Sequence, residues 1–211
     1  MSRISPSTAA AGRCTVFIIG GPGSGKTQLS RRIGAALGLP VFELDLIAGD
    51  GKAPDFLPSN PLVERIARAE EIAASREWVT EGAFLWWTDP LLSRANTIIW
   101  LDPPRRRAVT KVTTRYFQDL WRGEAGLPAA LRHPHLRWFV SFLVWSWRYY
   151  DPQRAVVLPL GSFPDELSRA AIPYALRSHE ARVIHWRGKP HQLDPLSIVQ
   201  RKGASVLATH H

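Results

Sequence analysis

The sequence predicts a single α/β domain in which a parallel sheet carries helices on both faces. Short β-rich apolar segments alternate with helical patterns along most of the 211 residues. Strands that are separated by helices normally run parallel, because the chain crosses back over the sheet between them. The first segment also leads directly into a glycine-rich turn and then a helix. The length fits one domain, and 45% hydrophobic residues suffice for a sizeable core.

Each expected element follows from a local pattern. Apolar runs that end at glycine, proline or acidic residues predict strands at 14–19, 41–45, 78–80, 97–101 and 182–186. Helical spacing and start signals predict helices at 28–37, after Asn60-Pro61, from Pro103-Pro104 to about Phe117, and from Asp194-Pro195 to about Leu207. Residues 1–12 resemble a disordered leader, and 13–211 form one domain with a helical insertion at about 118–152. We expect one residue of each strand to be buried: Ile18, Leu44, Val79, Ile99 and Ile184.

The glycine-rich turn has the spacing of a phosphate-binding P-loop. Residues 20–27 read GGPGSGKT, which matches G-x-x-x-x-G-K-[ST] between a strand and a helix. Backbone N–H groups in such a loop and the helix N-terminus attract phosphate. We therefore expect the nucleotide to contact Gly20, Gly21, Gly23, Ser24, Gly25, Lys26, Thr27 and Gln28. Lys26 would reach the β- and γ-phosphates, and the Thr27 hydroxyl would ligate Mg²⁺. No Asn-Lys-x-Asp motif is present, which favours ATP over GTP.

Further segments resemble the nucleotide-kinase branch of P-loop proteins, which includes adenylate and shikimate kinases. They are GLPVFELD (38–45), WVTEGAF (78–84), SRANTIIWLDPPRR (93–106) and FLVWSWRYY (142–150). Together with the P-loop they are similar to small bacterial adenylate-kinase-like proteins, also described as FlaR-type DNA topology modulation proteins. The resemblance implies a five-stranded parallel sheet of order 2-3-1-4-5, the nucleoside-kinase type of P-loop NTPase, with residues of the insertion acting as a lid.

Two acidic positions are the candidates for catalysis. Glu81 ends a strand that the resemblance places beside the P-loop strand, where it would bind Mg²⁺ through a water molecule or orient the nucleophile. Asp45 ends the second strand, and Glu43 lies two residues earlier on the same predicted strand face. The Glu-Leu-Asp pattern resembles the Asp-x-Asp of shikimate and gluconate kinases. Asp45 is therefore the candidate general base or acceptor ligand.

Basic residues after the fourth strand are the candidate lid cations. The resemblance implies that arginines from this region reach the transferring phosphoryl group. Arg115 is the first candidate and Lys111 the second, and their spacing of four puts them on one helix face. An exposed cationic face explains the same pattern almost as well. Arg122 follows in a glycine-bearing loop, and Arg94 matches a basic position of the family without an assigned role.

The acceptor is less well defined. The segment EGAFLWW lacks the arginine with which adenylate kinases contact AMP, and Lys52 is the only base in 45–60. We therefore expect a small acceptor with a hydroxyl group and little charge. Aromatic and apolar residues in 45–60 and 82–89 suggest that it is partly apolar, although they would also serve to pack the loops.

The net charge of +9 and the nine tryptophans leave a second function open. Trp138, Phe142 and Trp145 share a helical face near Arg148, an arrangement that suits nucleic-acid bases but also core packing or a dimer face. We favour packing, and a phosphotransferase over an ATP-gated nucleic-acid-binding protein, since such an enzyme already needs several basic residues. The oligomeric state is left open.

Other features argue against other classes of protein. With a single cysteine, Cys14, the chain has no internal disulfide, and His133 and His135 lack partners for a zinc site. The first residues contain no apolar signal segment, and the apolar stretch 138–147 is too short to span a bilayer, so we expect a cytoplasmic protein.

Overall fold

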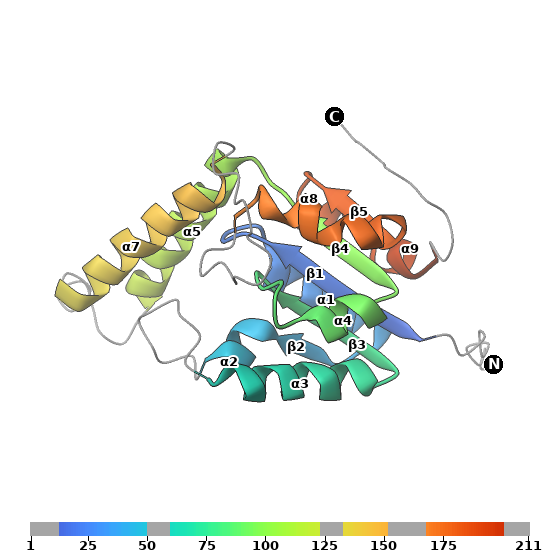
Figure 1. Ribbon diagram of the computed structural model, residues 1–211. Coiled ribbons are helices and arrows are strands. Elements are labelled where there is room, and N and C mark those ends of the chain that lie inside the picture. Colours follow the sequence, from blue (N-terminus) through green and yellow to red (C-terminus); the bar gives the residue numbers. More distant parts are fainter. Residues whose placement is uncertain (1–12, 50–59, 123–132, 152–167, 201–211) are drawn as a thin grey trace, which may run out of the picture.

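A computed structural model describes residues 13–49, 60–122, 133–151 and 168–200 (Figure 1). The expected leader 1–12 and residues 50–59 of the acceptor-side loop lie outside the described residues. So do part of the expected insertion and residues 201–211, which include the expected end of the last helix near Leu207.

The centre of the molecule is a five-stranded parallel sheet of order β2-β3-β1-β4-β5. This confirms the expected fold class and strand order. The P-loop strand is central, and Ile18 pairs in register with Glu81 on one side and Ile99 on the other. The carboxyl ends of the strands therefore bring the P-loop, Glu81 and Asp102 to one edge. The strands are β1 (Cys14–Gly20), β2 (Val41–Glu43), β3 (Glu77–Gly82), β4 (Thr97–Leu101) and β5 (Val183–Trp186).

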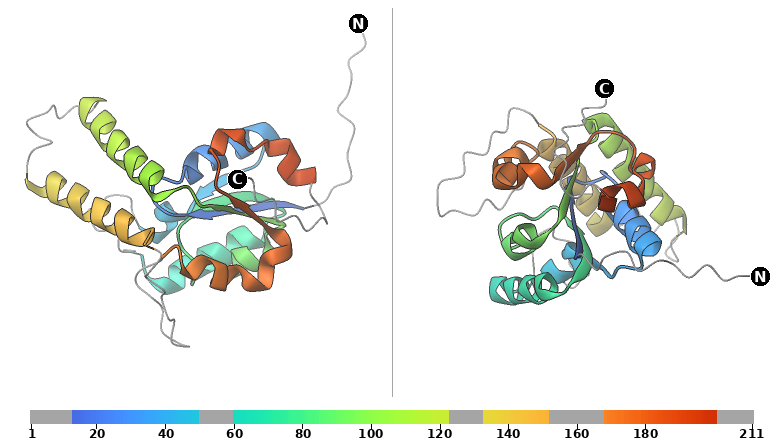
Figure 2. Two further views of the ribbon diagram at one scale, coloured as in Figure 1. Left: turned by 90° about the horizontal axis from the view of Figure 1, so that it is seen from above. Right: turned by 90° about the vertical axis from the view of Figure 1, so that its right-hand side faces the viewer.

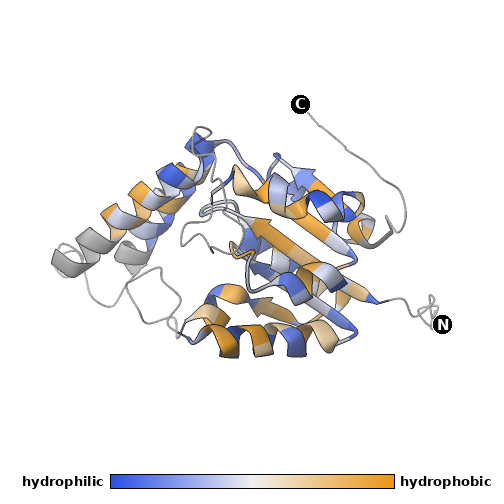
Figure 3. Ribbon diagram, in the orientation of Figure 1, coloured by the Kyte–Doolittle hydropathy of each residue, from blue (hydrophilic) through white to orange (hydrophobic). Residues whose placement is uncertain are grey.

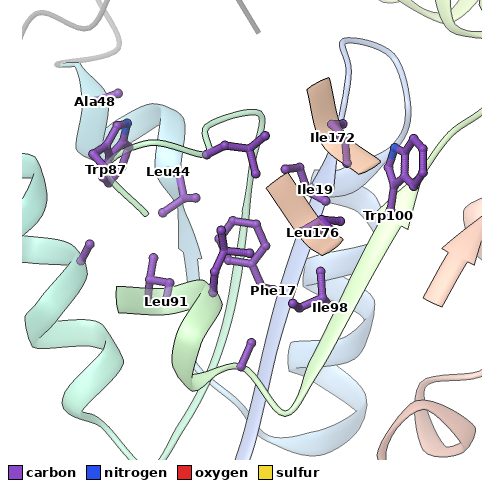
Figure 4. Packing of buried hydrophobic residues seen from close by; sticks show 14 of the residues in the cluster. Phe17, Ile19, Leu44, Ala48, Trp87, Leu91, Ile98, Trp100, Ile172 and Leu176 are labelled. Carbon is purple, nitrogen blue, oxygen red and sulfur yellow. The ribbon is translucent and has the colours of Figure 1, made fainter. Parts of the chain in front are cut away.

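Helices cover both faces of the sheet and enclose two hydrophobic clusters (Figure 2). On one face, Leu29 and Ile33 of α1 pack with Ile198 of α9 against alternate strand residues. On the other face, α3, α4 and α8 pack around Phe17, which lies at the centre of its cluster in Figure 4. Hydropathy agrees with this arrangement, since the central strands are mostly hydrophobic while the helices alternate between hydrophobic and hydrophilic residues (Figure 3). These helices are α1 (Lys26–Leu37), α3 (Leu62–Ala74), α4 (Asp89–Arg94), α8 (Ala171–Leu176) and α9 (Pro195–Gln200).

Two long helices, α5 (Arg105–Arg122) and α7 (His133–Tyr149), lie side by side and project from the carboxyl edge of the sheet (Figures 1 and 2). Tyr116 and Phe139 join them through stacked rings whose centroids are 3.7 Å apart. The first of these helices continues beyond Phe117, where the sequence pattern placed its end. Within the segments that the structure describes, no helix has the length and apolar character that crossing a membrane requires.

The structure corrects several local expectations. β2 ends at Glu43, and a short helix α2 (Leu44–Ala48) begins where the sequence suggested two more strand residues and then a loop. Leu44 is buried as expected, but from this helix. Ile18, Val79 and Ile99 are buried, whereas Ile184 is only half-buried, because β5 is an edge strand. Elements that the pattern did not indicate are α4, α8 and the 3₁₀ turns η1 (Arg177–Arg182) and η2 (Pro190–Gln192).

Candidate active site

The P-loop turns tightly between β1 and α1. Gly25 is the residue before the helix and has φ of 93°, a left-handed conformation that a side chain would strain. Gly21 has another constraint, because a Cβ there would collide with the ring of Tyr149. The backbone therefore passes close to its neighbours, and α1 starts at Lys26 with its first N–H groups directed toward the loop, as phosphate binding requires.

Lys26 extends back across the loop. Its Nζ donates a hydrogen bond to the carbonyl oxygen of Gly21 at 3.2 Å. The ammonium group thus lies beside the loop backbone, where phosphate oxygens would replace the carbonyl as acceptors. Gln28, expected to contact the nucleotide, lies in the first turn of α1 and is exposed.

Thr27 and Glu81 meet directly behind the P-loop. The Thr27 hydroxyl donates to Glu81 Oε1 at 2.5 Å, although the residues are 54 positions apart in sequence. Glu81 is buried, and its second oxygen, Oε2, accepts no hydrogen bond from the residues that the structure describes. Burial raises the pKa of the Glu81 carboxyl. The charge of Lys26 and the hydrogen bond from Thr27 oppose this increase, whereas the negative charges of Asp45 and Glu43 add to it.

These groups fit a Mg²⁺-nucleotide. Mg²⁺ prefers hard oxygen ligands and usually keeps several water molecules. A threonine hydroxyl and a carboxylate with one unsatisfied oxygen supply that chemistry beside a phosphate-binding loop. A bound cation would also lower the cost of holding the Glu81 carboxylate away from water.

Of the two candidate lid cations, Lys111 lies beside the P-loop. Its Nζ lies 3.4 Å from the position that a Cβ of Gly25 would occupy. Burial lowers the pKa of the Lys111 ammonium, with a further decrease from the charge of Arg107. Arg115, the first candidate from the sequence, lies one turn farther along α5, and both residues are exposed to solvent. α5 ends at Arg122, whose side chain lies outside the described part of the chain.

The acidic pair on the acceptor side differs from its expected arrangement. Asp45 lies in the first turn of α2, so it does not share a strand face with Glu43. Glu43 instead accepts a hydrogen bond from Arg31 at 2.7 Å. Asp45 is exposed, and it is near enough to Glu81 for its charge to raise that carboxyl's pKa. Asp45 therefore borders the site from a helix rather than from a strand.

An ionic cluster around the buried Asp102 was not expected. Asp102 follows β4 at the same edge, and both its oxygens accept hydrogen bonds from Arg169, at 2.5 and 2.7 Å. His185 Nε2 lies 2.9 Å from one of these oxygens, and Arg187 Nε 3.5 Å from it. Burial alone would raise the pKa of Asp102, but the hydrogen bonds and charges of His185 and Arg169 outweigh it and lower the pKa. The sequence could have indicated Asp102 from its position directly after an apolar strand. Its partners could not be predicted, because they lie more than sixty residues away in sequence.

The end of α7 packs on the P-loop, a second contact that the sequence did not reveal. Tyr150 Oη donates to the carbonyl oxygen of Pro22 at 3.1 Å, and Tyr149 covers Gly21. The backbone N–H of Arg169 donates to the carbonyl of Tyr149 at 2.9 Å. The projecting helices are thus connected to the P-loop and to Asp102. Arg94, which matched a family position, donates to the carbonyl of Ala73 and links α4 to α3.

No protein-family model matches the chain, and no curated protein matches it. Among solved structures, a gluconokinase from Sinorhizobium meliloti 1021 is similar with a TM-score of 0.43 and 16% identity, covering 92% of this chain and 91% of that one. A sugar kinase from Janibacter sp. HTCC2649 has a TM-score of 0.46 and 18% identity, with 93% and 99% covered. A shikimate kinase from Acinetobacter baumannii in complex with shikimate has a TM-score of 0.46 and 16% identity, with 89% and 92% covered.

Likeness at this distance carries no statement about activity. The assignment of the fold depends on this chain's own strand order and P-loop. The resemblance to the adenylate-kinase-like or FlaR-type family stays a prediction.

Proposed function

We propose that the protein is a phosphotransferase that moves the γ-phosphoryl group of Mg-ATP to a hydroxyl group of a small molecule. The observation that carries the proposal is the 2.5 Å hydrogen bond between Thr27 of the P-loop and the buried Glu81. A phosphate-binding loop alone binds nucleotide. A carboxylate directed at its threonine adds what Mg²⁺-dependent phosphoryl transfer requires.

Each residue has a distinct role in this proposal. The P-loop N–H groups and Lys26 hold the β- and γ-phosphates and balance their charge. Bound Mg²⁺ would neutralise the phosphates further. Thr27 would hold the ion directly through its hydroxyl group, and Glu81 would hold it through water molecules. Lys111, beside Gly25, adds a cation on the lid side. Asp45 accepts the proton of the attacking hydroxyl from its place at the start of α2.

The alternative, an ATP-gated nucleic-acid-binding protein, has less support in the arrangement of the aromatic residues. Trp147 is exposed on α7, but the guanidinium of Arg105 lies 3.8 Å from its ring centroid and occupies one face. Phe142 and Trp145 are half-buried, and the side chain of Trp138 lies outside the described part. Base stacking needs open ring faces, so we favour the enzyme.

Binding of a fluorescent ATP analogue, with and without Mg²⁺, tests the nucleotide part of the proposal. We expect saturable binding that Mg²⁺ strengthens. A screen of hydroxyl-bearing acceptors should then find compounds that stimulate ATP consumption, and Asp45→Asn should lose that stimulation. Absence of saturable, Mg²⁺-sensitive binding would refute the proposal. ATP-dependent and salt-sensitive binding of nucleic acid, without any stimulating acceptor, would favour the alternative.

Lys111→Ala is expected to lower kcat about tenfold or more, because a cation near the phosphates is lost. A hydrogen bond to a charged group is worth ~1.5–3 kcal/mol, and about 1.4 kcal/mol in the activation free energy is tenfold in rate. Arg115→Ala removes a charge from the next turn of the same helix and serves as the matched control, with a change of about twofold or less. Steady-state ATP consumption measures both. Equal losses in the two variants would show that the general charge of α5, rather than the position of Lys111, matters.

A further inference from the structure

Three consecutive residues of the P-loop are in contact with the two projecting helices, α5 and α7. A Cβ at Gly21 would collide with the ring of Tyr149, and the Tyr150 hydroxyl donates to the carbonyl oxygen of Pro22 at 3.1 Å. A Cβ at Gly23 would collide with the backbone of α5. The start of α5 and the end of α7 therefore pack directly on the backbone of the phosphate-binding loop.

One ion pair joins these two helix ends. Asp102 lies between β4 and the start of α5, and both its oxygens accept hydrogen bonds from the guanidinium of Arg169. The backbone N–H of Arg169 donates to the carbonyl oxygen of Tyr149, the last residue of α7, at 2.9 Å. In Figure 2 the start of α5 and the end of α7 are the ends of these helices nearest the sheet. Arg169 thus connects the segment that enters α5 to the tyrosines that contact the loop.

The contribution of Arg169 can be separated from neutralisation of the buried carboxylate. His185 Nε2 and Arg187 Nε lie 2.9 and 3.5 Å from Asp102 Oδ2. Without the Arg169 side chain, Asp102 would still have Arg187 and, when it is protonated, His185 as cationic partners. What Arg169 adds is a bidentate pair of charge-assisted hydrogen bonds, which fixes geometry as well as charge, and the contact with Tyr149.

A phosphate-binding loop works best when its N–H groups are already in place, because small displacements of such donors are costly. We propose that Arg169 and Tyr150 are positioning residues that hold the P-loop backbone in its phosphate-binding geometry. Arg169 acts through Tyr149, and Tyr150 acts through Pro22. Both act through the loop rather than by contact with the nucleotide. The inference rests on the proposed function and adds a role for the junction of Asp102 with Arg169.

Titration of a fluorescent ATP analogue in the presence of Mg²⁺ tests the proposal. Tyr150→Phe removes the hydroxyl donor and keeps the ring, while Arg169→Met removes the guanidinium and keeps the backbone N–H. We expect each variant to bind the analogue about fivefold more weakly, as loss of one hydrogen bond to the loop or its support implies. Tyr150→Phe carries the test if Arg169→Met does not fold.

Arg182→Met is the matched control. Arg182 also joins distant segments, since its guanidinium donates to the carbonyls of Ser93 and Ala95. These carbonyls precede β4, at the end of the sheet opposite the P-loop. The variant should lower stability but change the affinity for the analogue by no more than about twofold. Loss of affinity in the control as well would show that any loss of packing has this effect.

A double-mutant cycle tests whether the two residues act through the same loop. In the Tyr150→Phe background the loop has already lost part of its support, so Arg169→Met should weaken binding of the analogue less than it does in the wild type. Strictly additive losses would mean that Arg169 does not act through the end of α7, and its assignment would fall.

Hydrogen exchange of the ligand-free protein tests the proposal without nucleotide. Backbone amides of residues 20–25 should exchange several-fold faster in both variants than in the wild type or in Arg182→Met. If the wild-type chain did not bind ATP, the proposed function would fail, and exchange alone would decide whether Arg169 and Tyr150 hold the loop. Variants that exchange at the wild-type rate, or that bind ATP as tightly as Arg182→Met in a chain that binds it, would overturn the inference.

Discussion

Lys26→Ala should weaken binding of Mg-ATP about 10- to 100-fold and reduce turnover further. The variant removes the ammonium group that lies over the P-loop, held 3.2 Å from the Gly21 carbonyl. Each hydrogen bond to a charged group is worth ~1.5–3 kcal/mol, and 1.4 kcal/mol is tenfold in affinity. Turnover falls more than binding because charge on the phosphoryl oxygens must be stabilised most in the transition state.

A titration of the ATP analogue and steady-state ATP consumption measure the two effects. Arg76→Ala is a suitable control, since Arg76 is an exposed cation that directly precedes β3, at the sheet edge opposite the P-loop. It should change neither quantity by more than about twofold. If Lys26→Ala bound Mg-ATP as tightly as the control variant, the P-loop would not be the nucleotide site.

The parts of the site that the sequence predicted are those set by local chemistry. The P-loop is a contiguous motif, and its flanking strand and helix have clear apolar patterns. The position of Glu81 followed from the end of an apolar run together with the strand order of the resembling kinases. The structure confirms that order and brings Glu81 to Thr27.

The rest depended on information that a local pattern does not contain. The polarity pattern of residues 41–45 is too short to show whether the strand continues or ends and a helix begins. Asp45 was therefore assigned to the strand, whereas it lies in α2. The start of α4 was readable from Thr88-Asp89-Pro90 but was missed. The partners of Asp102 come from distant segments, and only tertiary packing brings them together.

Glu81→Gln is expected to make the ligand-free protein more stable and the enzyme much less active. The substitution keeps an oxygen that can accept the Thr27 hydroxyl, but it removes a buried charge whose second oxygen has no partner. The amide nitrogen takes the place of the unpaired oxygen and still lacks a partner there, so the gain comes only from removing the buried charge and is on the order of 1 kcal/mol in the free energy of unfolding above the folded pKa of Glu81. Loss of the carboxylate should lower kcat on the order of 10²-fold, the usual effect of removing one preorganised electrostatic group.

The stability difference should depend on pH in a definite direction. Because the pKa of Glu81 is raised in the folded protein, chiefly by burial, the folded state holds this proton more tightly than the unfolded state. As pH rises from the unfolded pKa toward the folded pKa, the unfolded chain loses the proton first, and the stability of the wild-type protein falls. Above the folded pKa the full cost remains. The gain from Glu81→Gln is therefore greatest above the folded pKa, and it disappears below the unfolded pKa.

Denaturant unfolding near pH 7.5 and near pH 4, together with Mg²⁺ titrations of ATP binding, measures both parts of this prediction. Glu77→Gln is the matched control, since Glu77 is exposed at the start of the same strand. It should change neither stability nor the Mg²⁺ dependence appreciably. Higher stability of Glu81→Gln combined with loss of the Mg²⁺ dependence would identify Glu81 as a group kept for chemistry at the expense of stability. A variant that is less stable than the wild type at neutral pH, or that retains the full Mg²⁺ dependence, would mean that Glu81 only supports the Thr27 hydroxyl.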